Sequence, residues 1–202
     1  MAEPIIISQS GTYRYVQDKA GELTINVLLL SSEDVDIEVI QTVPDCSVVI
    51  KGLCYINSKD SARVHTHVKH LASEGQSQQV VKFVLNDEAK GEFFGELYIA
   101  KDAQQIDAQQ TNRNILLSRQ ASMRTRPQLI IYADDVKASH GATTGQLDEN
   151  ALFYMQQRGI SKSTAQQLLL QAFVKDVLPL SLDGVSEHIQ ERLLSLGIGE
   201  EV

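Results

Sequence analysis

The spacing of the apolar residues changes once along this chain, within residues 134–148. Before that stretch apolar and polar residues alternate, as at Leu23, Ile25 and Val27, and after it apolar residues recur every three to four positions. Alternation is typical of strands with one buried face, and the longer spacing is typical of amphipathic helices. We therefore expect a β core over residues 1–145, with strands from about residue 21 to 137, and a helical segment over residues 146–202.

Clusters of turn-forming residues separate the candidate strands, at Asn57-Ser58-Lys59-Asp60, Glu74-Gly75, Asn86-Asp87 and Lys101-Asp102. Their rough rhythm fits a sandwich, a barrel or an irregular β-solenoid, and the pattern alone favours the sandwich. Residues 104–114 oppose that interpretation, because they are rich in glutamine and asparagine, which suit a core only as hydrogen-bonded ladders. In a solenoid, Gln104, Gln110 and Asn114 are expected to bond to the next coil.

Helix signals follow residue 147. Asp148 is a candidate N-cap for a first helix that ends near Arg158-Gly159, and Ser161 begins a second helix that Pro179 stops. A third helix is expected from about residue 185 to 197. All three are short and amphipathic, so we expect an appendage that packs on something larger.

Charge and composition exclude several functions. The chain carries 26 acidic and 18 basic residues, a formal net charge of −8, which argues against non-specific binding to nucleic acid or to anionic membranes. It has no apolar run of the ~18 residues that a transmembrane helix needs, and its first residues do not resemble a secretory signal. Two cysteines are too few for a disulfide framework. We therefore expect a cytoplasmic location.

The densest histidine cluster lies at residues 65–70. His65 and His67 share one strand face, whereas His70 points to the other, and no glutamate follows at the spacing of a metal-binding strand pair. Solvated or core-satisfied histidines are the favoured interpretation over a metal site. Cys46 and Cys54 are interpreted as buried structural thiols.

His140 has small neighbours, Ser139, Gly141 and Ala142, so its ring can reach beyond the backbone. By its chemistry alone it is interpreted as a surface or capping histidine. The adjacent carboxylates of Asp134 and Asp135 would face opposite ways on a strand, which argues against a shared acid–base pair.

A series of short motifs runs through residues 91–160: Gly91-x-Phe93-x-Gly95, Asp102-Ala103-Gln104, Ala108-x-Gln110-x-Asn112-x-Asn114, Leu116-Leu117-Ser118, Pro127-Gln128-Leu129, Asp134-Asp135-Val136-Lys137, Ser139-His140-Gly141-Ala142-Thr143, Gly145-Gln146-Leu147-Asp148, Leu152-Phe153-Tyr154 and Arg158-Gly159-Ile160. Together with His65-Thr66-x-Val68-x-His70, they resemble the C-terminal core of the SufB/SufD iron–sulfur cluster assembly proteins, the SufD branch in particular. The resemblance fades before about residue 45 and after about residue 178.

The resemblance implies a mainly β fold, a right-handed parallel β-helix followed by a small C-terminal helical segment. It implies a non-enzymatic scaffold subunit that pairs with a SufB-like subunit and binds a SufC-type ABC ATPase. A transient iron–sulfur cluster, or iron, would be shared with the SufB-like partner and not held tightly by the isolated chain. His140 corresponds to the family's cluster-site histidine. Residues near the cluster interface would be Asp134, Asp135 and Lys137, and those that bind the ATPase would be Phe153, Tyr154, Arg158, Leu169 and Phe173.

Two departures from the family pattern shape further expectations. Ala138 stands where the family usually has cysteine, which leaves imidazole as the one soft ligand in the motif. The family also has an N-terminal helical segment and a longer β-helix, so the chain is expected to be a short homologue or a fragment. An open strand edge favours pairing with another chain, so the isolated chain is expected to form a homodimer near residues 134–138.

Two other functions stay open. One is an interaction module of the same fold that has lost cluster chemistry, which Ala138 favours. The other is a β-helix enzyme acting on polysaccharides, which the 5% aromatic content and the lack of tryptophan disfavour.

Overall fold

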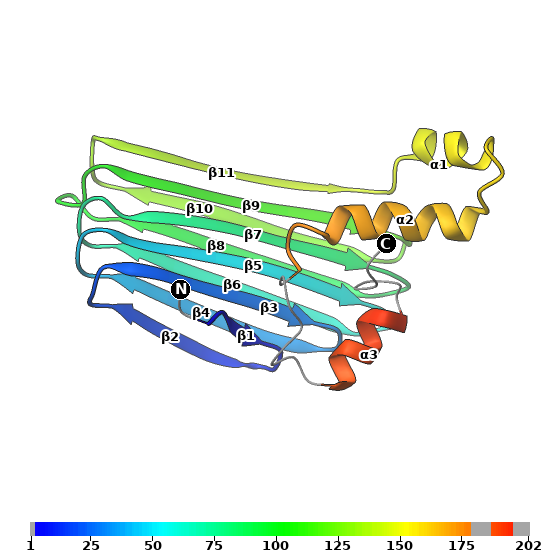
Figure 1. Cartoon of the computed structure of the whole chain (residues 1–202), viewed down its shortest axis with the longest axis horizontal. Helices are drawn as coiled ribbons and strands as arrows, with labels where there is room; N and C mark the ends of the chain where they lie inside the picture. Colours follow the sequence, from blue (N-terminus) through cyan, green and yellow to red (C-terminus); the bar gives the residue numbers. More distant parts are fainter. Residues whose placement is uncertain (1–2, 179–186, 196–202) are drawn as a thin grey trace.

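The chain forms a β-solenoid with helices at its C-terminal end (Figure 1). The computed structural model describes residues 3–178 and 187–195, which contain eleven strands and three helices. The strands are β1 (Ile5–Ile7), β2 (Gly11–Gln17), β3 (Gly21–Leu29), β4 (Glu33–Gln41), β5 (Cys46–Ile56), β6 (Ser61–His70), β7 (Gln76–Leu85), β8 (Lys90–Ile99), β9 (Ile106–Leu116), β10 (Ser122–Ile131) and β11 (Val136–Gly145).

Successive strands alternate between two sheets. Sheet A has the order β1-β3-β5-β7-β9-β11, and sheet B has the order β10-β8-β6-β4-β2. Every pairing in both sheets is parallel. This confirms the mainly β, parallel solenoid with C-terminal helices that the family resemblance implied. The sandwich favoured by the pattern alone is wrong, because antiparallel and parallel strands share the same side-chain period.

The core lies between the inner faces of the two sheets. In β4, Val35, Ile37 and Val39 are fully buried while the residues between them face outward. Phe83 of sheet A and Phe93 of sheet B are the largest fully buried side chains. Burying each such side chain contributes roughly 1.5–3 kcal/mol, and this burial holds the coils together.

The strands extend beyond the predicted range at both ends. β1 and β2 precede residue 21, and β11 continues past residue 137 to Gly145. Residues 104–114, which resisted a strand interpretation, contain most of β9. The stretch that carries His140 is therefore a strand and not a connecting loop.

Two of the three expected amide contacts between coils form. Gln104 Oε1 accepts a hydrogen bond from Asp135 N at 2.9 Å, and Asn114 Nδ2 donates to Thr143 O at 3.0 Å. The Gln110 amide has no hydrogen-bond partner among the described residues. It reaches across the lumen to Gly95, where an added Cβ would lie 2.2 Å from Gln110 Nε2.

The helices are α1 (Glu149–Gln156), α2 (Lys162–Val174) and α3 (Glu187–Ser195). Both expected N-caps are confirmed: Asp148 Oδ1 accepts from Asn150 N at 2.8 Å, and Ser161 Oγ accepts from Thr164 N at 3.1 Å. Pro179 and the predicted ends of the third helix, residues 185 and 197, lie outside the described residues. No described helix is long and apolar enough to cross a membrane.

A second apolar cluster joins α2 and α3 to the outer face of sheet A. Its buried members are Leu28, Leu53, Tyr55, Val84, Ile115, Leu170, Val174, Val177 and Leu193. Lys82, whose side chain is buried, donates to Phe173 O at 2.6 Å and lies 2.5 Å from Asp176 Oδ1. In contrast, α1 buries no residue and projects beyond the solenoid (Figure 1).

Candidate functional site

His140 lies on β11, the last strand of sheet A. Its register partner on β9 is Gln110, whose own partner on β7 is Gln79. Paired residues share a face, so His140 continues a column of side chains that points into the lumen. Gln79 and Gln110 are buried, but His140 is exposed because no described strand follows β11. The imidazole therefore stands at the open end of the solenoid.

The surroundings of His140 supply few other ligand atoms. Ala138, two residues earlier on the same face, is half-buried and packs against the core. An added Cβ at Gly141, on the opposite face of the strand, would meet nothing within 4 Å, so the outer face of β11 is open at this position. Among the described residues, no group of three or more His, Cys, Asp or Glu side chains could hold a metal ion. His140 alone is an incomplete metal site, because iron and zinc sites in proteins combine several ligands.

The other three predicted site residues lie just before His140, in the turn and first residues of β11. Asp134 and Asp135 are exposed. The backbone of Asp135 is anchored to the preceding coil, since its N–H donates to Gln104 Oε1 and its carbonyl accepts from Gln105 N at 2.7 Å. Lys137 is exposed beside Asp107 in the β9–β11 register. The four residues thus share the last coil, but Lys137 lies on the outer face of β11 and His140 on the inner face.

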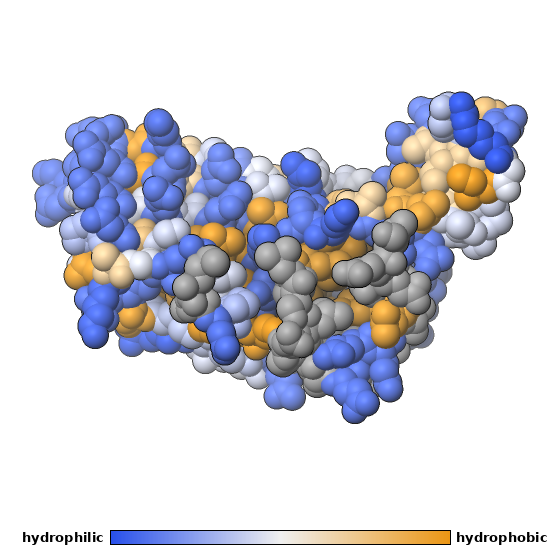
Figure 2. Space-filling view, viewed as in Figure 1, coloured by the Kyte–Doolittle hydropathy of each residue, from blue (hydrophilic) through white to orange (hydrophobic). Residues whose placement is uncertain are grey.

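The residues predicted to bind an ATPase divide into two groups. On and just after α1, Phe153 and Tyr154 are 63% and 58% exposed, and the Arg158 guanidinium stacks 3.5 Å from the centre of the Tyr154 ring. On α2, Leu169 and Phe173 are half-buried, and the Phe173 ring lies 4.7 Å from Lys82 Nζ. Figure 2 shows apolar surface over the α1–α2 end of the molecule.

A hollow of about 510 Å³ separates α1 from the end of the solenoid. Its apolar lining comes from Leu116, Leu117, Leu147, Leu152 and Phe153. The hollow lies at the same end of the molecule as the exposed Phe153 and Tyr154 side chains, so this end presents both protruding aromatic side chains and a groove.

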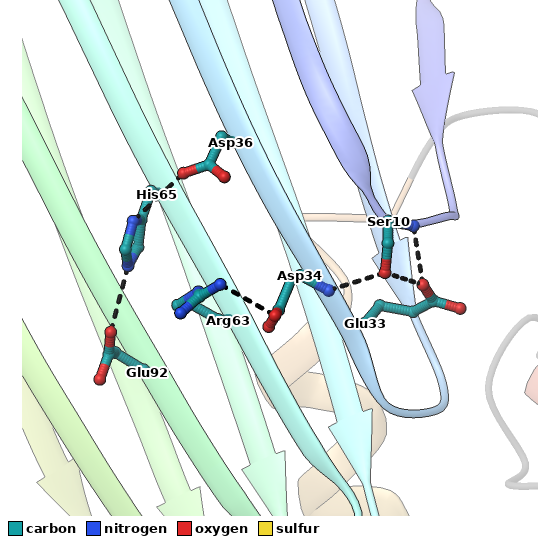
Figure 3. A network of polar contacts seen from close by, with 7 residues as sticks. All are labelled: Ser10, Glu33, Asp34, Asp36, Arg63, His65 and Glu92. Atoms are coloured by element: carbon teal, nitrogen blue, oxygen red, sulfur yellow. Dashed lines mark hydrogen bonds and ion pairs between the residues drawn. The ribbon is translucent and has the colours of Figure 1, made fainter.

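The histidine cluster takes the positions expected from alternation. His65 and His67 face outward from sheet B, and His70 faces inward and is buried. The His65 ring lies between two carboxylates of neighbouring strands, with Nδ1 3.2 Å from Asp36 and Nε2 3.2 Å from Glu92 (Figure 3). Because the carboxylates approach from opposite sides of the ring, this is a chain of cross-strand contacts and not a chelate.

Three buried titratable groups are neutral in the folded chain. Burial lowers the pKa of His70 to about 4, and its Nε2 lies 2.9 Å from Ser77 Oγ. Burial also raises the pKa of the Cys46 and Cys54 thiols. Both cysteines are free and buried, as expected for structural thiols.

Comparison with known proteins gives the family. The model of the SufBD core domain, described as SUF system FeS cluster assembly, matches residues 7–173. The iron–sulfur cluster assembly protein SufD of Escherichia coli (strain K12) is 37% identical over 129 residues, which is 63% of this chain and 30% of that protein. SufD of Bacillus subtilis (strain 168) is 29% identical over 149 residues, 73% of this chain and 33% of that protein.

A SufBD family protein of Synechocystis is 35% identical over 127 residues, 63% of this chain and 28% of that protein. The matches thus span about a third or less of these relatives' length. The family-model match begins at the last residue of β1 and ends in α2, so it includes β2 to β11 and with them the strand that carries His140. The chain therefore belongs to the SufBD family of iron–sulfur cluster assembly proteins.

Proposed function

We propose that the chain is a SufD-like scaffold subunit that pairs with a SufB-like subunit and a SufC-type ABC ATPase to assemble and transfer iron–sulfur clusters. The observation that carries this proposal is the exposed His140 imidazole on β11, a strand whose outer edge has no partner among the described strands, without enough neighbouring ligands in the described residues to complete a site. Such a site requires a second subunit. The relatives named SufD support the same assignment.

In this proposal the cluster is cargo and His140 is one of its ligands. The neutral imidazole offers one nitrogen lone pair to iron, and Ala138 offers nothing. The thiolates that an iron–sulfur cluster requires must then come from the SufB-like subunit. Asp134, Asp135 and Lys137 would contact that subunit beside the cluster and not bind it. Iron or a cluster is thus held by the complex, and only poorly by the isolated chain.

The helical end would bind the ATPase. α1 buries none of its residues, so its exposed Phe153 and Tyr154 are free to dock without disturbing the fold. α2 links α1 to the solenoid through Leu170, Val174 and the Lys82 contacts. Arg158 would hold the Tyr154 ring in place, while Leu169 and Phe173 would contribute the half-buried edge of the docking surface.

A second function of the same fold is an interaction module without cluster chemistry. The observation that favours it is Ala138, since the last coil then carries no thiolate. In either case the isolated chain is proposed to form a homodimer through β11, whose outer edge is unpaired among the described strands. A cytoplasmic location remains a prediction.

Co-purification tests the proposal. The tagged chain would be co-expressed with the SufB-like and SufC-type subunits of the same genome, and the purified complex analysed for composition, iron and acid-labile sulfide. We expect a three-component complex that carries more iron per chain than the tagged chain alone. A complex without iron would favour the module, and failure of both subunits to bind would overturn the proposal.

A further inference from the structure

The outer face of sheet B alternates in charge from strand to strand. The charged outward residues of β4 and β8 are acidic over most of their length, and those of β2, β6 and β10 are basic. The acidic members are Asp34, Asp36, Glu38, Glu92 and Glu96, and the basic members are Arg14, Arg63, His65, His67, Lys69, Arg124 and Arg126. Lys90, the first residue of β8, is the one exception among the described charged outward residues of the two acidic strands.

Contacts between neighbouring strands follow this alternation. Arg63 lies 2.9 Å from Asp34, and Glu38 lies between Arg14 at 2.8 Å and Lys69 at 2.6 Å. Figure 3 shows the same order across three strands, from Asp36 through His65 to Glu92. Opposite charges on adjacent strands attract and like charges repel, so the alternation favours this strand order over others.

The alternation stops at β10 with basic residues that have neighbours on one side only. β10 pairs with β8 and with no other described strand. Arg124, with 82% of its side chain exposed, reaches Glu92 at 3.6 Å, and Arg126 lies over the Phe94 ring at 5.1 Å. Neither guanidinium has a carboxylate on the side of the free edge in the described part of the chain.

The backbone of the free edge is also interrupted. Ser122 N donates to Ala89 O, just before β8, and Tyr132 N donates to Ile99 O, at the end of β8, both at 3.0 Å. Even-numbered residues therefore turn their N–H groups toward β8. Odd-numbered residues therefore face the free edge. Pro127 is one of them and has no N–H to donate. Backbone pairing at this edge lacks a central donor, and side-chain charge becomes the main source of specificity.

We propose that the strand which continues sheet B beyond β10 belongs to the SufB-like partner and carries carboxylates opposite Arg124 and Arg126. This inference rests on the proposed function and specifies the chemistry of its interface. It extends the observed order of basic and acidic strands by one position, from an acidic β8 and a basic β10 to an acidic partner strand.

A second copy of this chain is the poorer occupant of the β10 edge. The outward positions of β10 hold Ser122, Arg124, Arg126, Gln128 and Ile130, with no acidic residue among them. Two-fold pairing of β10 would therefore gather four guanidinium groups on one surface. Self-association through β11 of sheet A does not involve the β10 edge. We expect the SufB-like subunit to displace the second copy when it binds.

Charge reversal tests the proposal with the purified SufB-like subunit of the same genome. We compare the wild-type chain with the double variants Arg124→Glu/Arg126→Glu and Arg124→Gln/Arg126→Gln, and with the matched control Lys19→Glu/Lys59→Glu, whose exposed lysines lie in turns away from β10. All four should have the same circular dichroism spectrum and melting temperature, because the replaced side chains are not part of the core.

The glutamate pair is expected to weaken binding about tenfold or more, the glutamine pair less, and the control hardly at all. Added salt should weaken wild-type binding and leave the glutamate variant unchanged or tighter. Equal affinity of the glutamate variant and the wild type would overturn the inference while leaving the proposed function intact. A wild-type chain that does not bind the SufB-like subunit would overturn both.

Discussion

His70 is expected to make the solenoid sensitive to acid. Its side chain is fully buried, its Nε2 is hydrogen-bonded to Ser77, and its Nδ1 has no partner among the described residues. Gln41 Oε1 lies on the same side, since an added Cβ at Gly75 would be 2.7 Å from His70 Nδ1 and 2.8 Å from Gln41 Oε1, but it makes no hydrogen bond with the ring. Within residues 3–178 and 187–195 no carboxylate contacts His70, so no described acidic group compensates a positive ring.

The size of the effect follows from the two pKa values. Burial lowers the pKa of His70 from 6.5 to about 4. Above pH 6.5 the His70 ring is neutral in both the folded and the unfolded chain, so it does not make the unfolding free energy depend on pH. Between pH 6.5 and about 4 only the unfolded chain binds the proton, so the unfolding free energy falls as the pH falls. The full difference amounts to about 3 kcal/mol of unfolding free energy, a substantial share of the roughly 5–15 kcal/mol typical of a domain.

Urea unfolding at about pH 7.5 and about pH 4.5 measures this loss. The wild type should lose more unfolding free energy between the two pH values than His70→Gln, whose amide can still bond Ser77 but cannot titrate in this range. His140→Gln is the matched control, because it removes an exposed histidine and should behave like the wild type. Equal losses in the wild type and His70→Gln would refute the reasoning.

Two further predictions concern packing and docking. Gly95→Ala should lower the unfolding free energy by about 1–3 kcal/mol, because the added methyl group clashes with the Gln110 amide. Gln110→Ala in the same chain should restore part of the lost stability. Urea unfolding of the single and double variants measures both effects, and additive losses would contradict the proposed clash. Tyr154→Glu should weaken a pull-down of the SufC-type ATPase without changing the melting temperature, since the Tyr154 side chain is exposed. If the double variant Phe153→Glu/Tyr154→Glu binds the ATPase as the wild type does, the docking site is elsewhere.

Local patterns in the sequence predicted much of the fold. Alternation identified most strands, and Asp148 and Ser161 marked the starts of two helices because capping is a local interaction. The pairing of strands was not predictable in this way. Neighbours in a sheet here are not consecutive in the chain, as in Arg63 beside Asp34, 29 residues apart. The charge alternation of sheet B was therefore invisible until the register was known.

The candidate site was predicted by motif more than by physical pattern. β11 consists largely of small or polar exposed residues, such as Ser139, Gly141 and Thr143, so it shows no apolar alternation and was not predicted as a strand. The buried face of α2 was also not predictable from its leucine run: Leu170 and Val174 are buried, whereas Leu168 is 39% exposed. In so short a leucine run, several helical stripes fit equally well.

The central claim is that His140 becomes an iron ligand only when the complex assembles. The direct test is anaerobic reconstitution of the complex with iron and sulfide, followed by measurement of bound iron and sulfide for the wild type and His140→Ala. We predict that the variant folds and binds the SufB-like subunit as the wild type does, but retains much less iron and sulfide, and that the isolated wild-type chain retains little. Unchanged iron and sulfide in the His140→Ala complex would contradict the claim and leave His140 as a surface residue of the last strand.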